Sequence, residues 1–302
     1  MNFTRKLLLS PLVLATCLAT DALAAQRVFV RSNGADSGSC TLNAPCRSFA
    51  FAMTQVDPGG EVVALDAAGY GPVSIDKSVT ITANPGFFAG ISAATGSAIT
   101  VNGANIDVVL RSLNLNGLGA TTGINVVAAR SVTVENCVVS NFSANGIEVL
   151  TTGDIRLLDS IARGNGANGI LIGGGAVATV TNVRMSNNAG SGLRAQDATN
   201  FTTYVNVTGS DSSSNFAGFY AFQTQTGFIR MSIRNSTASF NANAGVYSGA
   251  LPNIFVAVGS SSIVGNAIGL SNSGANLETY GDNLLRYNAT ATAGTITPVA
   301  GQ

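Results

Sequence analysis

The segment SANGIEVL, at residues 143–150, is followed by GANGILIG at residues 166–173, which begins 23 positions later. Both copies place Asn-Gly before an alternating aliphatic segment. A Gly followed by an apolar residue recurs at Gly123, Gly146, Gly169, Gly192, Gly218, Gly245 and Gly269, and Asn residues precede these glycines at Asn116, Asn141, Asn165, Asn188, Asn215, Asn241 and Asn266, with Asn288 after the last. The spacing of roughly 24 residues indicates a repeat architecture rather than a globular domain.

Each repeat contains short alternating strands and turns rich in Asn and Gly, with no room for a helix of ten residues or more. This excludes helical solenoids, and the period is too short for propeller blades. Because crossovers between parallel strands are right-handed in nearly all proteins, we predict an all-β, right-handed, single-stranded parallel β-helix. Apolar pairs such as Val132/Val134 and Val205/Val207 are expected to point inward, with Asn side chains stacked as a ladder between coils.

The segment PCRSFAFAMTQV precedes the repeats. It places Phe49, Met53 and Val56 at helical spacing, and Pro45 suits a first helical turn. A short helix here would cap the open end of the core. The expected organisation is a signal peptide at 1–25, an N-terminal segment at 26–60, the β-helix at 61–290, and residues 291–302 as a tail or a loose final strand.

The N-terminus is typical of an export signal. Arg5 and Lys6 precede the apolar segment LLLSPLVLA, which is too short to span a membrane, and Ala22-Leu23-Ala24 offers small residues for cleavage before Ala25. We therefore expect a secreted or periplasmic protein with no membrane span after cleavage. The alternative is a lipoprotein acylated at Cys17.

Export permits disulfides, and Cys40 and Cys46 flank the short loop TLNAP, so we predict a bridge between them. Cys137 lies in the apolar segment VENCVV and is expected to be a buried small hydrophobe. The chain contains no histidine, and its scattered thiols make a poor metal set, so we expect no metal site and no cofactor.

Composition excludes one class of partner. Charged residues make up only 10% of the chain and the formal net charge is zero, with no basic run. Binding of nucleic acid requires cationic neutralisation of phosphates, so no nucleic-acid partner is expected.

The segments CTLNAPCRSFAFAM and GGEVVALDAAGYGPVSIDKSVTI, followed by Asn-Gly coils, resemble a group of secreted bacterial right-handed β-helix proteins similar to the pectate-lyase-like superfamily. The group has no established activity. The resemblance implies kinship with polysaccharide lyases, glycoside hydrolases, carbohydrate esterases, phage tailspikes and adhesins. The motifs of β-helix polygalacturonases (an Asp-Asp pair, GHG and RIK) are absent from this sequence.

Alignment of the coils on the repeated Gly gives two outward columns. The first is expected to place Tyr220 beside Tyr247 and Glu148 two coils from Arg194; it reads Asn125, Glu148, Leu171, Arg194, Tyr220, Tyr247 and Ser271. The second is expected to form a surface ion pair between Arg111 and Glu135; it reads Arg111, Glu135, Leu158, Thr181, Thr208, Arg234 and Gly259. Neither column contains the cluster of carboxylates that calcium requires.

Function must be argued from a site rather than a fold. The candidate ligand-binding face is Asn125, Glu148, Arg194, Tyr220 and Tyr247, where tyrosine rings and a charged rim suit a sugar chain. We expect a non-catalytic protein that binds a polysaccharide, such as a cell-surface glycan, or serves structurally. The alternatives are a polysaccharide lyase or glycoside hydrolase with an unfamiliar active site, and an adhesin or passenger fragment.

Overall fold

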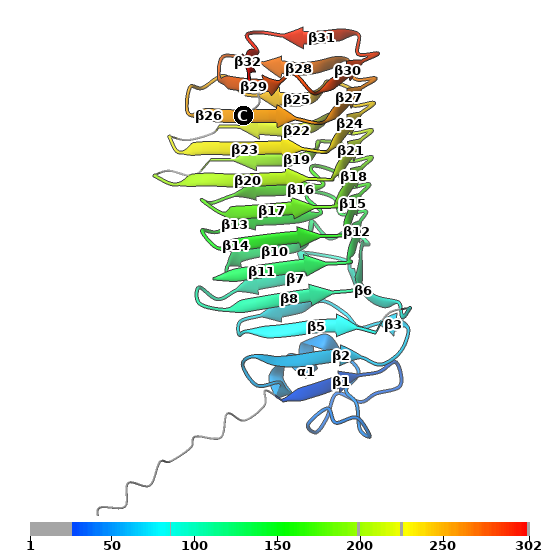
Figure 1. The fold of residues 1–302 in the computed structure, drawn as a ribbon. Helices are drawn as coiled ribbons and strands as arrows, with labels where there is room; N and C mark the ends of the chain where they lie inside the picture. Colours follow the sequence, from blue (N-terminus) through cyan, green and yellow to red (C-terminus); the bar gives the residue numbers. More distant parts are fainter. Residues whose placement is uncertain (1–25, 85, 198–199, 224–225, 301–302) are drawn as a thin grey trace, which may run out of the picture.

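The computed structural model describes residues 26–84, 86–197, 200–223, 226–300. Within these ranges the chain winds into a parallel β-solenoid with three faces, seen from the side in Figure 1. Each coil contributes one strand to each of three sheets, so that consecutive strands of one sheet come from consecutive coils. The predicted parallel β-helix is therefore confirmed.

Sheet 1 has 12 strands among the described residues, in the order β1 (Arg27–Val30), β2 (Gly60–Ala64), β5 (Val79–Ala83), β8 (Asp107–Arg111), β11 (Ser131–Glu135), β14 (Asp154–Leu158), β17 (Val177–Thr181), β20 (Thr202–Thr208), β23 (Phe228–Arg234), β26 (Ile254–Gly259), β29 (Asn276–Tyr280) and β32 (Thr297–Val299). Sheet 2 has 10, in the order β3 (Ala68–Gly69), β6 (Ala89–Ala93), β9 (Leu113–Gly117), β12 (Val138–Ser140), β15 (Ile161–Arg163), β18 (Arg184–Ser186), β21 (Asp211–Ser213), β24 (Thr237–Ser239), β27 (Ser262–Val264) and β30 (Leu284–Arg286). Sheet 3, also of 10 described strands, contains β4 (Val73–Ile75), β7 (Ser97–Asn102), β10 (Thr122–Ala128), β13 (Ile147–Leu150), β16 (Ile170–Gly173), β19 (Ser191–Gln196), β22 (Ala217–Phe222), β25 (Ala244–Ser248), β28 (Ile268–Asn272) and β31 (Thr290–Ala293).

The core is a stack of aliphatic side chains between the three sheets. On sheet 1 the inward pairs Val132/Val134 and Val205/Val207 are buried, as the alternation predicted. Parallel pairing aligns them coil by coil, with Val132 opposite Ile155 and Val134 opposite Leu157. This alternation leaves the intervening residues of each strand on the outer face, where they are available for function.

The repeated Gly is explained by close packing of the coils. A Cβ added to Gly146 would lie 2.6 Å from the carbonyl oxygen of Gly169 and 2.7 Å from Nδ2 of Asn165. Gly146 itself is not among the residues with positive φ, so a left-handed backbone does not explain why glycine stands there. Only a residue without a side chain fits against the next coil there.

The left-handed positions instead form a column at the corner between sheets 2 and 3. Its members share a φ between 54° and 68° and are Asn141, Gly164, Asn187, Ser214, Phe240, Gly265 and Tyr287. Asn and Gly tolerate this conformation, whereas an aromatic residue there carries backbone strain. The corner therefore turns at one residue per coil, whatever its side chain.

The predicted Asn ladder is present but begins later than expected. The side chain of Asn165 donates to Oδ1 of Asn188 at 2.9 Å, and the pattern continues through Asn215, Asn241, Asn266 and Asn288. Asn141 does not belong to this ladder; it lies one residue earlier, in the left-handed column, and donates to Asn116 at 2.8 Å. The buried position in that coil is held by Phe142.

Helix α1 (Phe49–Gln55) closes the N-terminal end of the core, as predicted, and buries Phe49 and Met53. Pro45 lies outside it: the N-cap is Ser48, whose hydroxyl accepts from the backbone N–H of Phe51 and donates to Asp36 at 2.8 Å. At the other end, residues Thr290–Ala293 and Thr297–Val299 are strands β31 and β32, the strand alternative for the C-terminal segment. The predicted signal peptide at 1–25, with Cys17, lies outside the described residues.

Candidate functional site

The column predicted as a ligand-binding face lies on the outer surface of sheet 3. The strand register pairs Asn125 with Glu148, Leu171 with Arg194, and Tyr220 with Tyr247. Glu148 also pairs with Leu171, which separates it from Arg194 by two strand steps. The structure thus brings Arg194, Tyr220 and Tyr247 side by side and leaves Glu148 apart, where it accepts a hydrogen bond from Asn145 at 2.7 Å.

The rings of Tyr220 and Tyr247 stack face to face. Their centroids are 4.7 Å apart and the rings are within 8° of parallel. The guanidinium of Arg194 lies 5.7 Å from the ring centroid of Tyr220 and 4.5 Å from the ring centroid of Phe222. Arg194 and Tyr247 lie on the two strands that flank the strand of Tyr220. A sugar ring cannot stack between rings that are already in contact, so this column has the geometry of a side-chain ladder.

Arg194 is an electrostatically unusual residue in this column. Its Nε is buried and has no hydrogen-bond partner among the described residues. Burial lowers the pKa of Arg194, and burial likewise raises the pKa of Tyr220. Aromatic contacts, rather than a carboxylate, stabilise this cation.

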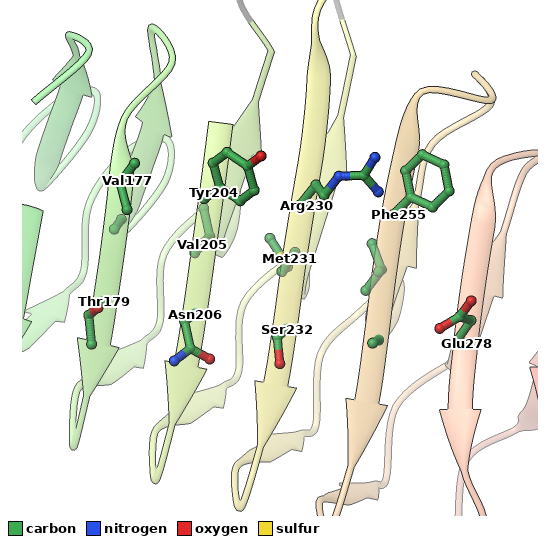
Figure 2. Close-up of a pocket in the computed structure, with 13 residues that line it drawn as sticks. Val177, Thr179, Tyr204, Val205, Asn206, Arg230, Met231, Ser232, Phe255 and Glu278 are labelled. Atoms are coloured by element: carbon green, nitrogen blue, oxygen red, sulfur yellow. The ribbon is translucent and has the colours of Figure 1, made fainter. Parts of the chain in front are cut away.

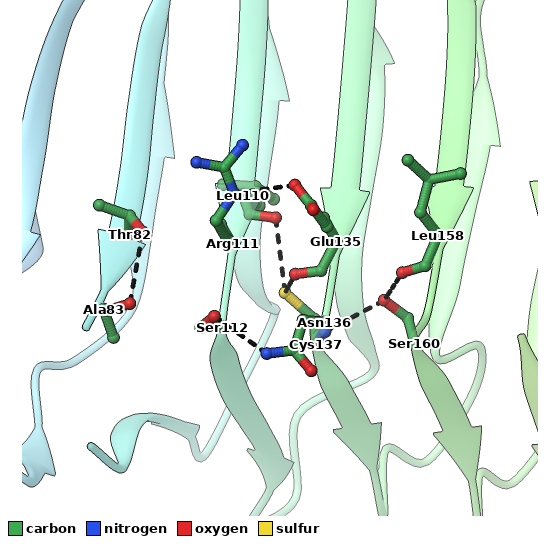
Figure 3. A network of polar contacts seen from close by, with 10 residues as sticks. All are labelled: Thr82, Ala83, Leu110, Arg111, Ser112, Glu135, Asn136, Cys137, Leu158 and Ser160. Atoms are coloured by element: carbon green, nitrogen blue, oxygen red, sulfur yellow. Dashed lines mark hydrogen bonds and ion pairs between the residues drawn. The ribbon is translucent and has the colours of Figure 1, made fainter. Parts of the chain in front are cut away.

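The second predicted column lies at the C-terminal ends of the strands of sheet 1, and Figure 3 shows its first three members, Arg111, Glu135 and Leu158. The predicted ion pair between Arg111 and Glu135 is confirmed, with Nε 2.8 Å from the carboxylate oxygen. The two side chains are 47% and 34% exposed, so the pair contributes at most about 1 kcal/mol.

The cysteines also lie where the sequence indicated. Cys40 and Cys46 form a disulfide beside the N-terminal cap. Cys137 is buried, and burial raises the pKa of its thiol to about 12, so the reactive thiolate is suppressed. In Figure 3 the backbone N–H of Cys137 donates to the hydroxyl of Ser160, which lies in the next coil.

A hollow that sequence reasoning missed lies elsewhere, on the outer face of sheet 1. It is a shallow groove of about 340 Å³ across strands β17, β20, β23, β26 and β29. Two rows of outward side chains line it. The first row is Val177, Tyr204, Arg230 and Phe255, and the second is Thr179, Asn206, Ser232, Ala257 and Glu278.

Figure 2 shows Tyr204 and Phe255 on either side of Arg230 in the first row. The Arg230 guanidinium is 4.1 Å from the Phe255 centroid, a cation–π contact that holds its side chain along the groove. Tyr204 is 46% exposed, so its ring is available to a ligand. The second row supplies hydroxyl, amide and carboxylate groups, with Glu278 on the last strand of the groove.

A second depression of about 270 Å³ lies on the same face, nearer the N-terminus. It is lined by Asp107, Arg130, Asp154 and Arg156, together with Ser131 and Thr133. Arg130 donates to Asp107 through Nε at 2.8 Å and through its terminal nitrogen. These hydrogen bonds lower the pKa of Asp107 to about 2. Asp154 and Arg156 are exposed and form no ion pair within 4.0 Å with any described residue.

One signal in the sequence points to the groove. The residues just before the inward Val205, Met231 and Val256 are Tyr204, Arg230 and Phe255. These residues form a column as regular as the two that we aligned on Gly. The column is hard to recognise in the sequence because its two aromatic residues, Tyr204 and Phe255, are 51 positions apart.

In the part of the chain that the structure describes, no group of three or more His, Cys, Asp or Glu residues is placed to hold a metal ion. The same described residues include no helix that is long and apolar enough to cross a membrane.

Comparisons with solved structures agree with this architecture. A pectate lyase, Pel9A, superimposes with a TM-score of 0.69 at 18% identity, over 91% of this chain and 80% of that one. A rhamnogalacturonan lyase superimposes with a TM-score of 0.62 at 12% identity, over 91% of this chain and 87% of that one. XylC in complex with xylose superimposes with a TM-score of 0.59 at 9% identity, over 91% of this chain and 70% of that one. At these identities the likeness shows the fold alone.

A search of curated proteins found no match. A family model for the right-handed β-helix region matches residues 89–288, about two thirds of the chain. This match confirms the predicted right hand of the solenoid. The chain is a member of the right-handed β-helix family.

Proposed function

We propose that this protein is exported and binds a polysaccharide, such as a cell-surface glycan, in the groove of sheet 1. The observation that carries the proposal is an exposed tyrosine ring and a half-buried phenylalanine ring, one face of which Arg230 covers, beside a parallel row of hydrogen-bonding groups. Tyr204 and Phe255 offer apolar surface, while Asn206 and Ser232 offer polar partners one row away. Carbohydrates have apolar ring faces and hydroxyl edges, so both rows are used at once.

Export is supported by the disulfide between Cys40 and Cys46, since such bridges persist in oxidising compartments. The test is N-terminal sequencing of the protein recovered outside the cytoplasm. We expect the mature chain to begin at Ala25 or at Gln26, at the end of the predicted signal peptide. An uncleaved Met1 would contradict export through the signal peptide, and acylation at Cys17 would assign the lipoprotein route.

Binding is tested by affinity gel electrophoresis against a panel of soluble polysaccharides. We expect at least one polymer to retard the mature protein, and Tyr204→Ala to abolish most of that retardation. Tyr247→Ala is the matched control, because Tyr247 is a half-buried tyrosine on sheet 3. Loss of retardation in Tyr247→Ala alone would instead place the site on the face predicted from the sequence.

Catalysis on a polysaccharide is the second candidate, favoured by the depression that contains Asp154 and Arg156. Hydrolysis or elimination needs a base and an acid beside the bond that breaks. Asp107 is a poor proton donor because Arg130 holds its pKa at about 2, so Asp154 and Arg156 are the candidates. Reducing ends or unsaturated products that are lost in Asp154→Asn would establish an enzyme. Their absence with every polymer that binds would support binding alone.

A further inference from the structure

The groove of sheet 1 also has features that select among polysaccharides, and the following inference rests on the proposed function. We propose that its ligand is an uncharged, flat glycan whose units alternate in orientation, as in a β-1,4-linked chain of neutral sugars. Three observations support this: the charge balance of the face, the direction of the two rows, and the spacing of the aromatic rings.

The strands of the outer face carry equal numbers of opposite charges, and Arg130, just before β11, adds one cation that pairs with Asp107. Strands β8, β11, β14, β17, β20, β23, β26 and β29 contain four arginines and four carboxylates: Arg111, Arg156, Arg230 and Arg234 against Asp107, Glu135, Asp154 and Glu278. A polymer with a carboxylate on every unit would need a cation at nearly every coil. Between β17 and β29 the arginines lie on β23 alone, and Glu278 would repel such a polymer at the last strand.

The rows fix the direction of the ligand. Each row crosses the strands, because its members are register partners in successive coils. The rows lie two residues apart along each strand, roughly 7 Å. A chain of sugars that runs along the solenoid axis can therefore place its ring faces on the first row and its hydroxyl edges on the second. One sugar advances about as far as one coil, so successive units meet successive strands.

In this arrangement the two aromatic residues of the first row contact every second sugar unit of the ligand. Tyr204 on β20 and Phe255 on β26 are separated by two strand steps, roughly 9.6 Å. In a β-1,4-linked ribbon, adjacent units are turned by half a revolution, so every second unit presents the same face. Arg230, on the strand between them, donates to the hydroxyls of the intermediate unit while Phe255 holds its guanidinium. A coiled α-1,4-linked chain cannot keep this contact over the length of the groove.

The test is isothermal titration calorimetry of the mature protein with hexasaccharides. Cellohexaose, xylohexaose and mannohexaose are the neutral ribbons, maltohexaose is the neutral coil, and hexagalacturonate is the anionic chain. We expect at least one ribbon to bind, with an affinity that does not change between low and high salt. Tyr204→Ala and Phe255→Ala should each weaken it at least about fivefold.

Tyr220→Ala and Tyr247→Ala are the matched aromatic controls and should leave the affinity unchanged. Circular dichroism and thermal unfolding establish that each variant is folded, and Phe255→Leu provides a milder change at the more buried ring. Tighter binding of hexagalacturonate or maltohexaose than of every ribbon would overturn the inference while leaving the proposed function intact. If no saccharide or polysaccharide of any class binds, the proposed function itself fails.

Discussion

The side-chain amide of Asn165 donates to Oδ1 of Asn188 at 2.9 Å, and the same oxygen accepts the backbone N–H of Asn165 at 3.1 Å. Two donors of one coil thus depend on one side chain of the next, and both residues are buried. The ladder keeps the coils of the solenoid in register and so keeps the rows of the groove aligned.

Replacement of Asn188 tests the ladder. Asn188→Ala leaves two buried donors of Asn165 without an acceptor, and we expect a loss of about 2–4 kcal/mol in the free energy of unfolding. Asn141→Gly is the matched control, because it removes the exposed Asn141–Asn116 bond while glycine tolerates the left-handed backbone of this position, and it should cost less than about 1 kcal/mol. Urea unfolding measures both. Equal costs would show that burial does not decide the strength of the ladder.

The Gly of the repeat should tolerate no side chain. In Gly146→Ala the new Cβ would lie 2.6 Å from the carbonyl oxygen of Gly169, so the coils must separate locally. We expect a loss of about 1–3 kcal/mol, as for other overpacked sites. Gly281→Ala, where a Cβ meets nothing within 4 Å, should be neutral. A neutral Gly146→Ala would contradict close packing as the reason for the repeat.

Phe240 is in the left-handed conformation (φ 54°) and its side chain is 69% exposed. Because Asn is more stable in this conformation, we expect Phe240→Asn to raise the stability by up to about 1 kcal/mol. Phe216→Asn is the control: Phe216 is 49% exposed but is not among the residues with positive φ. Differential scanning calorimetry should show a higher Tm for the first variant alone; a lower Tm would mean that the Phe240 ring contributes more than its strain costs.

The ion pair of Asp107 and Arg130 predicts a pH dependence. Arg130 lowers the pKa of Asp107 from 3.8 to about 2, so the folded protein binds fewer protons than the unfolded chain in this range. The stabilisation is therefore complete above about pH 4 and disappears as the pH falls through about 2. Because the side chains are 65% and 41% exposed, screening by solvent keeps this stabilisation small.

Urea unfolding of Asp107→Asn beside the unsubstituted protein measures this effect. The difference should be present at pH 6 and vanish near pH 2. Asp154→Asn, at a carboxylate that has no ion pair among the described residues, should show no such convergence. A difference for Asp107→Asn that persists at pH 2 would contradict an ionic origin.

The repeat spacing was sufficient to predict the fold and much of the register. Coils of 23 residues carry no insertion, so Glu148, Leu171 and Arg194 align as the Gly anchor predicted. Side-chain direction was harder to predict. Tyr220 and Tyr247 are adjacent, as expected, but the sequence does not show that their faces are turned toward each other rather than toward solvent.

The groove was missed for a related reason. A hollow depends on the relative sizes of side chains in neighbouring columns, and one column read alone does not contain that information. Thr179, Asn206 and Ser232 are small, and they form a depression only because Tyr204 and Phe255 stand beside them. The short Asn-rich turns are equally ambiguous, since Asn141 and Asn165 look alike in the sequence but lie in different columns.

Hydroxyl-radical footprinting tests the central claim most directly, because it locates a bound polysaccharide on the protein. With the protein saturated by a polymer that retards it in affinity electrophoresis, we predict reduced labelling of Tyr204 and Phe255 and unchanged labelling of Tyr220 and Tyr247. Protection of Tyr220 and Tyr247 with full labelling of Tyr204 would contradict the account and place the ligand on sheet 3.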